Sequence, residues 1–62
     1  MKQANFKNVK VGQRFMDQTN KRYVKIKPCS VAGEMKNAVC IQFGGYYFFG
    51  NVAVSILEDD EG

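Results

Sequence analysis

The sequence predicts an all-β protein: a single small five-stranded antiparallel barrel or a highly curved sheet. Three observations support this prediction. The chain has 62 residues, which suffices for one domain with a thin core. Its β-branched and aromatic residues lie in short runs of alternating polarity, whereas no long segment shows the helical period of 3.6 residues. Turn-forming residues separate these runs at the close spacing that is typical of small barrels.

The strands follow from these runs and from the residues between them. The five expected strands cover residues 6–15, 21–27, 38–43, 46–49 and 52–57. Asn20 lies in a polar turn and can adopt a left-handed conformation. Pro28 ends the second strand, and residues 29–37 form a loop with Gly33 near its tip. Gly44 and Gly45 predict a tight turn, because glycine adopts positive φ at little cost.

Some local features are less regular. Gly12 permits a bend or bulge in the first strand. A helix is the poorer alternative throughout, and the only candidate for one is a single turn near residues 31–36 or near residues 50–52, where Gly50 interrupts the run of strands.

The alternation also predicts which side chains form the core. In the second strand, Val24 and Ile26 are expected to point inward, whereas Tyr23 and its lysine neighbours point outward. The expected core is Phe6, Val11, Phe15, Val24, Ile26, Val39, Ile41, Val52, Val54 and Ile56.

Charge divides the chain into three parts. Residues 1–27 carry eight basic groups and one acidic group, a net charge of +7. Residues 28–57 are neutral overall, and residues 58–61 add four acidic groups. We therefore expect one domain over residues 1–57 and an acidic, disordered tail over residues 58–62. The basic half favours an anionic partner, while the tail is either a solvated terminus or a mimic of phosphates.

Composition argues against an enzyme. Histidine is absent, which removes the usual general base and the common nucleophile pairs and zinc patterns. Cys29 and Cys40 are too few for a disulfide framework and are expected to be inert thiols, without a metal or cofactor. Asp17 and Glu34 are expected on separate turns rather than as an acid–base pair. No long apolar run or leader-like segment occurs, so a cytoplasmic protein is expected.

The first candidate binding site is a basic stripe on the second strand. Alternation places four side chains on one face, about 6.5–7 Å apart for every two residues. The stripe is Lys21, Tyr23, Lys25 and Lys27, and Arg22 at the strand entry can join it. Cations at this spacing suit nucleic-acid phosphates, and a tyrosine ring between them can stack on a base. The alternative is an ordinary solvated face of a half-exposed sheet.

The second candidate is the aromatic run over residues 46–49. Four consecutive aromatic side chains cannot all point inward from one strand. Either Tyr46 and Phe48 are buried with Tyr47 and Phe49 outside, or the reverse. We include Tyr47 and Phe49 in the candidate site, because exposed aromatic residues often anchor interfaces. The alternative is that a small barrel with open ends covers both pairs.

The spacing of apolar residues and turns over residues 6–57 resembles that of a group of known proteins. The pattern is Phe6-x-x-Val9-x-Val11-Gly12-x-x-Phe15, then Tyr23-Val24-Lys25-Ile26, then Asn37-Ala38-Val39, then a glycine turn and an aromatic strand ending in Val52-x-Val54. It resembles short uncharacterised proteins encoded by bacteriophages and prophages. The segment from Phe48 to Val54 is also similar to the end of an SH3-like barrel, but the acidic loop and tryptophan of the SH3 peptide groove are missing.

The resemblance implies a function for the two candidate surfaces. Such accessory proteins modulate or inhibit host machinery, including defence nucleases. The expected partner is therefore a host protein or nucleoprotein complex, and the protein is expected to be non-enzymatic. Direct binding of single-stranded nucleic acid or RNA is the alternative. A homodimer is also plausible, because a thin core gains from additional apolar burial.

Overall fold

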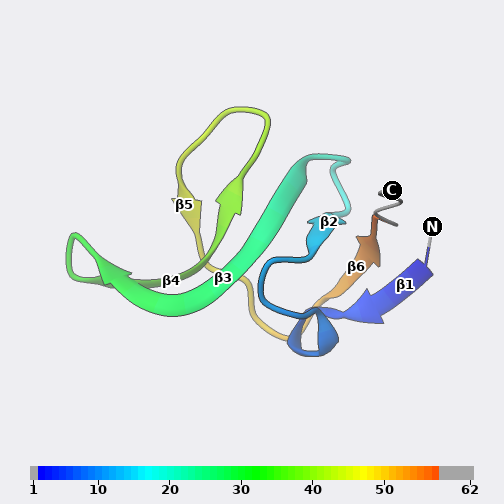
Figure 1. Ribbon diagram of the computed structural model, residues 1–62, viewed down its shortest axis with the longest axis horizontal. Helices are drawn as coiled ribbons and strands as arrows, with labels where there is room; N and C mark the ends of the chain where they lie inside the picture. Colours follow the sequence, from blue (N-terminus) through cyan, green and yellow to red (C-terminus); the bar gives the residue numbers. More distant parts are fainter. Residues whose placement is uncertain (1, 58–62) are drawn as a thin grey trace.

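The computed structural model describes residues 2–57, and the acidic tail predicted over residues 58–62 lies outside these described residues. Within them the chain forms one antiparallel sheet of six strands (Figure 1). The strands are β1 (Lys2–Asn5), β2 (Arg14–Met16), β3 (Arg22–Val31), β4 (Glu34–Cys40), β5 (Tyr46–Tyr47) and β6 (Ala53–Ile56), and Phe6–Asn8 form one 3₁₀ turn. The prediction of an all-β fold without α-helices is confirmed for residues 2–57.

The sheet is open rather than closed into a barrel. Its strand order is β1-β6-β2-β3-β4-β5, which leaves β1 and β5 at the two edges of the part described. The prediction of a five-stranded barrel is therefore wrong, and the sheet is open. β3 and β4 form a long bent hairpin that extends away from the other strands (Figure 1). This curvature coincides with a shift in the β3–β4 register between Lys25 and Cys29.

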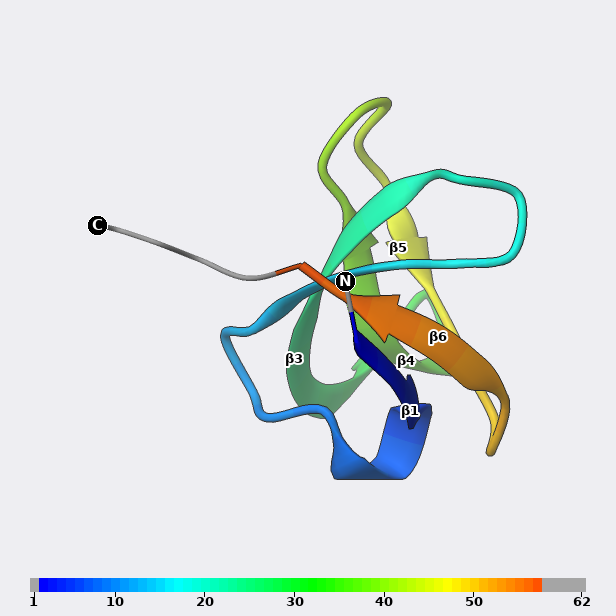
Figure 2. The same ribbon diagram turned by 90° about the vertical axis from the view of Figure 1, so that its right-hand side faces the viewer.

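Two turns lie at one end of the molecule. The β2–β3 loop and the β4–β5 loop are both at the top of Figures 1 and 2, opposite the 3₁₀ turn. Asn20 has φ 68°, and Gly44 and Gly45 have φ 78° and 93°, so both predicted turns are confirmed. The N–H of Ile41, at the start of the β4–β5 loop, donates to the carbonyl of Arg22 (2.9 Å), which follows the β2–β3 loop. This bond connects the two loops.

Strand boundaries differ from the prediction in three places. None of residues 6–13 is in a strand, because the 3₁₀ turn and a turn from Lys10 to Gln13 occupy this segment. β3 continues through Pro28 to Val31, so the predicted loop over residues 29–37 is a hairpin with its turn at Gly33. A proline, which has no N–H to donate, is tolerated there because it lies within the shift of the β3–β4 register, and among residues 2–57 no other strand pairs with β3 at that position. Neither candidate for a helical turn, residues 31–36 or residues 50–52, is helical, whereas Phe6–Asn8 form a 3₁₀ turn that the sequence did not indicate.

The core is smaller and more aromatic than predicted. Its buried members are Phe6, Val9, Phe15, Tyr23, Ala38, Cys40 and Val54, with Phe49 and Ile56 packed against them. The predictions for Phe6, Phe15 and Val54 are confirmed. Three predicted members, Val11, Ile41 and Val52, are exposed. Three others, Val24, Ile26 and Val39, are only half-buried, since they lie on the opposite face from Tyr23 and Ala38.

Candidate binding surface

The predicted stripe does not form one exposed face. Tyr23 is 3% exposed, and its ring packs against Phe15, Phe49 and Tyr47 at centroid distances of 5.6, 4.9 and 5.4 Å. The outward orientation predicted for Tyr23 was therefore wrong. A bulky tyrosine ring fills a thin core better than valine does, and its hydroxyl remains near the polar β2–β3 loop. Tyr23 is thus unavailable for stacking on a nucleic-acid base.

Lys25 also leaves the stripe, because its side chain lies over the core. Its Nζ donates to the carbonyl of Phe6 at 3.1 Å and lies 4.5 Å from the centre of the Phe6 ring. These contacts connect β3 to the 3₁₀ turn. The Lys25 backbone also accepts from the Gly12 N–H and donates to the Gln13 carbonyl, which connects β3 to the segment before β2. Lys25 therefore has a structural role within the described chain.

Lys21, Arg22 and Lys27 remain exposed but do not form a continuous basic row. Lys21 lies in the β2–β3 loop, and Lys27 lies beyond the part of β3 that pairs with β2. Arg22 is on the outer face of the sheet, since its neighbour Tyr23 points to the core. The structure thus separates the predicted stripe into a core part and scattered surface cations.

The aromatic run follows the second of its two predicted arrangements. Tyr47 and Phe49 turn toward the core, where Phe49 stacks on Phe6 at 5.2 Å and Tyr47 meets Tyr23. Phe49 is therefore largely a packing residue, whereas Tyr47 keeps about two-fifths of its surface exposed. The exposed pair, Tyr46 and Phe48, was not included in the predicted site.

An amide side chain holds Phe49 in place after β5 ends. The Nδ2 of the buried Asn37 donates to the Phe49 carbonyl (2.9 Å), and the Phe49 N–H donates to Asn37 Oδ1 (2.8 Å). The side chain thus supplies the donor and acceptor that a neighbouring strand would otherwise provide. This pair of bonds keeps residues 46–49 alternating between the core and the outside.

From the end of β4 to the residue after β5, four large apolar side chains are at least 48% exposed. They are Ile41, Phe43, Tyr46 and Phe48, which we call the hairpin surface. Their exposed fractions are 48–71%, and Phe43 at the turn is the most exposed. Their placement follows from alternation, because Tyr46 pairs with Val39 on the outer face. One signal in the sequence could have revealed Phe43: an aromatic residue directly before a Gly-Gly turn lies beyond the reach of the core.

A pocket of about 310 Å³ adjoins the hairpin surface on the outer face. It is lined by Arg14, Arg22, Ile41 and Leu57, which come from β2, β3, the β4–β5 turn and the end of β6. The N–H of Leu57 donates to the Arg14 carbonyl (3.1 Å), and that of Ile41 donates to the Arg22 carbonyl. Two arginines separated by 8 residues in the sequence therefore share one pocket with two aliphatic side chains. We call it the arginine pocket.

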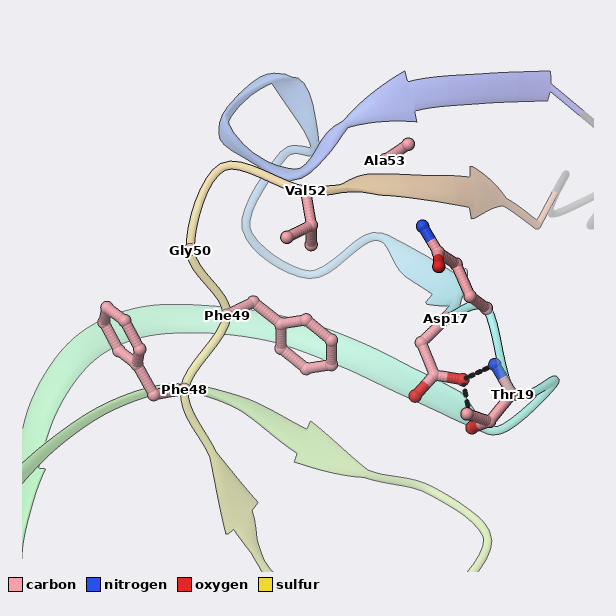
Figure 3. A pocket seen from close by; sticks show the side chains of 8 residues that line it. Asp17, Thr19, Phe48, Phe49, Gly50, Val52 and Ala53 are labelled. Atoms are coloured by element: carbon pink, nitrogen blue, oxygen red, sulfur yellow. Dashed lines mark hydrogen bonds between the residues drawn. The ribbon is translucent and has the colours of Figure 1, made fainter.

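A second pocket, of about 300 Å³, lies on the core side (Figure 3). Phe49 points into it toward Asp17, whereas Phe48 points away. The Asp17 Oδ1 accepts from the Thr19 N–H (2.9 Å), the Thr19 hydroxyl (2.7 Å) and the Lys21 N–H (3.0 Å). Burial acts to raise the pKa of Asp17, but these hydrogen bonds outweigh it and lower that pKa. The carboxylate is thus chiefly committed to ordering the β2–β3 loop.

The other chemistry-bearing residues are far apart. Asp17 lies in the β2–β3 loop, whereas Glu34 is at the tip of the long β3–β4 hairpin, paired with Lys36 at 3.0 Å. Cys29 and Cys40 are free thiols. Within residues 2–57 no group of three or more histidine, cysteine or acidic side chains is arranged to hold a metal ion. The described segments also contain no helix with the length and apolarity needed to cross a membrane.

Comparison with known proteins adds no family to this description. No family model, curated protein or solved structure matches the chain. The hairpin surface and the arginine pocket are therefore the features of the described chain that bear on function.

Proposed function

We propose that this chain is a non-enzymatic accessory protein that binds a host protein or nucleoprotein complex through the hairpin surface. The observation that supports the proposal is the exposure of Ile41, Phe43, Tyr46 and Phe48. Fully burying one such side chain contributes roughly 1.5–3 kcal/mol. A 62-residue chain has little apolar surface to spare, and yet these four side chains remain outside the core.

The composition of the surface favours a protein partner. Interface hot spots are rich in tyrosine and arginine, and they lie where large apolar side chains can be covered completely. Here Tyr46 and Phe43 are exposed on the β4–β5 hairpin, and Arg22 lines a pocket together with Ile41. The partner is expected to offer an apolar groove beside an acidic rim.

The origin of the protein belongs to the same proposal. The proposal of a phage origin depends on the resemblance of its sequence pattern to short bacteriophage and prophage proteins. A protein of this kind acts in the cytoplasm of the host cell, where a defence nuclease is one possible class of target.

Direct binding of single-stranded nucleic acid is the alternative function. Arg22, Tyr46 and Phe43 are all exposed, and an exposed cation and exposed aromatic rings are the side chains that such binding uses. This alternative requires a steep fall in affinity with salt, because each phosphate contact releases counterions.

The test compares two double variants in affinity capture from bacterial lysate. Phe43→Ser with Phe48→Ser removes the centre of the hairpin surface. Val11→Ser with Met35→Ser is the matched control, because both side chains are 55% exposed and lie elsewhere. We expect wild type and control to retain one stoichiometric protein that the hairpin variant loses, with similar melting temperatures for all three.

Four results would contradict the proposal. The hairpin variant could retain the same partner, or the wild type could retain none. If wild type and control were dimers in solution and only the hairpin variant were a monomer, the hairpin surface would instead bind a second copy of this chain. Salt-sensitive binding of oligonucleotides by the wild type alone would favour the alternative function.

A further inference from the structure

We propose that the pocket beside the β2–β3 loop binds an arginine side chain of the protein partner, with the guanidinium group facing Asp17 and the aliphatic stem against the apolar wall. We call this space of about 300 Å³ the aspartate pocket. Its polar side is formed by Asp17 and the loop that follows, and its apolar side includes Phe48, Phe49 and Val52. The inference rests on the proposed function, because it specifies one residue type of the partner that covers the hairpin surface.

The negative charge of Asp17 has no cationic partner within residues 2–57. Of the two acidic side chains there, Glu34 pairs with Lys36, whereas Asp17 forms no ion pair with any of these described residues. Its Oδ1 accepts instead from neutral N–H and hydroxyl donors of its own loop. Burial acts to raise the pKa of the carboxyl group, but these bonds and the Tyr23 hydroxyl together lower it. Asp17 is thus an oriented, ionised carboxylate that a cation from outside can balance.

The wall opposite the carboxylate suits a flat cation with an apolar stem. The Phe49 ring points into the pocket toward Asp17 (Figure 3), and a cation between a carboxylate and an aromatic ring is attracted by both. Phe48 is 60% exposed and Val52 is 43% exposed, so an aliphatic stem that covers them removes apolar surface from water. Arginine suits this site better than lysine, because a guanidinium group is less strongly hydrated and stacks on aromatic rings.

The aspartate pocket is continuous with the hairpin surface, because Phe48 belongs to both. A partner that covers Phe48 therefore brings a neighbouring side chain to the pocket. The volume of about 300 Å³ is at the lower end of the range of small-molecule sites, about 300–1,000 Å³. A space of this size suits one side chain rather than a longer segment of the partner.

The experiment titrates the full-length protein with acetylated arginine amide and with its citrulline counterpart, and follows backbone amide signals by NMR. Citrulline has nearly the same shape but no charge, so the comparison isolates the effect of the cation. We expect the arginine probe to shift signals of Thr19, Phe49 and Gly50, and to bind about fivefold more tightly than the citrulline probe. The net charge of +3 opposes general attraction of a cation, so this preference would have to arise locally.

Two variants test whether Asp17 is responsible for the preference. Asp17→Asn removes the charge but retains an Oδ1 that can accept the loop bonds. It is expected to lose the preference for arginine and to keep the wild-type affinity for citrulline. Glu34→Gln removes the same charge at the tip of the β3–β4 hairpin, and it is expected to leave both affinities within about twofold. Cross-peaks between the arginine methylenes and the Phe49 ring in wild type provide a check that does not depend on the folding of a variant.

Other outcomes would overturn the inference. Equal affinities of the wild type for the two probes would show that the carboxylate does not recognise a cation. An unchanged preference in Asp17→Asn, or an equal loss in Glu34→Gln, would assign the binding to another site or to diffuse charge. Tighter binding of guanosine than of the arginine probe would assign the pocket to a nucleobase. If the pocket fails while the hairpin variant still loses its partner, the proposed function stands without this detail.

Discussion

Two groups of aromatic side chains have opposite environments in this short chain. Phe6, Phe15, Tyr23 and Phe49 form a continuous cluster with ring centroids 4.9–5.6 Å apart. Phe43, Tyr46 and Phe48 are at least half exposed. Residue type does not separate the groups, since each contains phenylalanine and tyrosine. What separates them is the strand face and the distance from the turn, so the second group is free to contact a partner.

The sharpest way to break this comparison is to truncate one residue of each group. Phe15 is fully buried, and Phe15→Ala is expected to cost about 3–5 kcal/mol, comparable to the whole stability of so small a domain. Phe43→Ala is expected to change stability by less than about 0.5 kcal/mol. Urea denaturation measures both. Similar losses in the two variants would show that the hairpin surface is part of the core.

Asn37 tests what holds Phe49 on the core side. Asn37→Ala leaves the N–H and carbonyl of Phe49 without their bonds, and the expected loss of stability is about 1–3 kcal/mol. Asn51→Ala is the control, because Asn51 is exposed and lies in the same connection. Thermal denaturation measures the difference. If Asn37→Ala melted like the control, the side-chain bonds would not be what orders residues 46–49.

The dependence of stability on alkaline pH distinguishes the buried Tyr23 from the exposed tyrosines, and it is the smallest of the expected effects. Burial and then the Asp17 charge raise the pKa of Tyr23 from 10.0 to about 12. The neutral Tyr23 hydroxyl is therefore favoured in the folded state. Its contribution to the free energy of unfolding is fully present below pH 10 and is lost as the pH rises toward 12. Stability measured across this window should fall in wild type and in Tyr46→Phe, but less in Tyr23→Phe. An identical fall in Tyr23→Phe would assign the effect to another group.

Tyr23 and Lys25 show where sequence reasoning succeeded and where it failed. The alternation over residues 21–27 correctly predicted a strand and correctly put Tyr23 and Lys25 on one face. It assigned that face to solvent, because valine and isoleucine are more apolar than tyrosine and lysine. In the fold the tyrosine ring fills the core, and the lysine stem covers Phe6 while its ammonium group meets a carbonyl. Both side chains have an apolar body and a polar tip, so residue type alone did not settle their direction.

The sequence was enough to predict an all-β chain, the turns at Asn20 and Gly44-Gly45, and burial of Phe6, Phe15 and Val54. These features depend on backbone preferences and hydrophobicity within a few residues. The open strand order, the core-facing side of β3 and the meeting of Arg14 with Arg22 arise only when distant strands pair. The physical reason is that a strand presents two faces of opposite parity. Which face is covered depends on the side chains that distant strands bring to it.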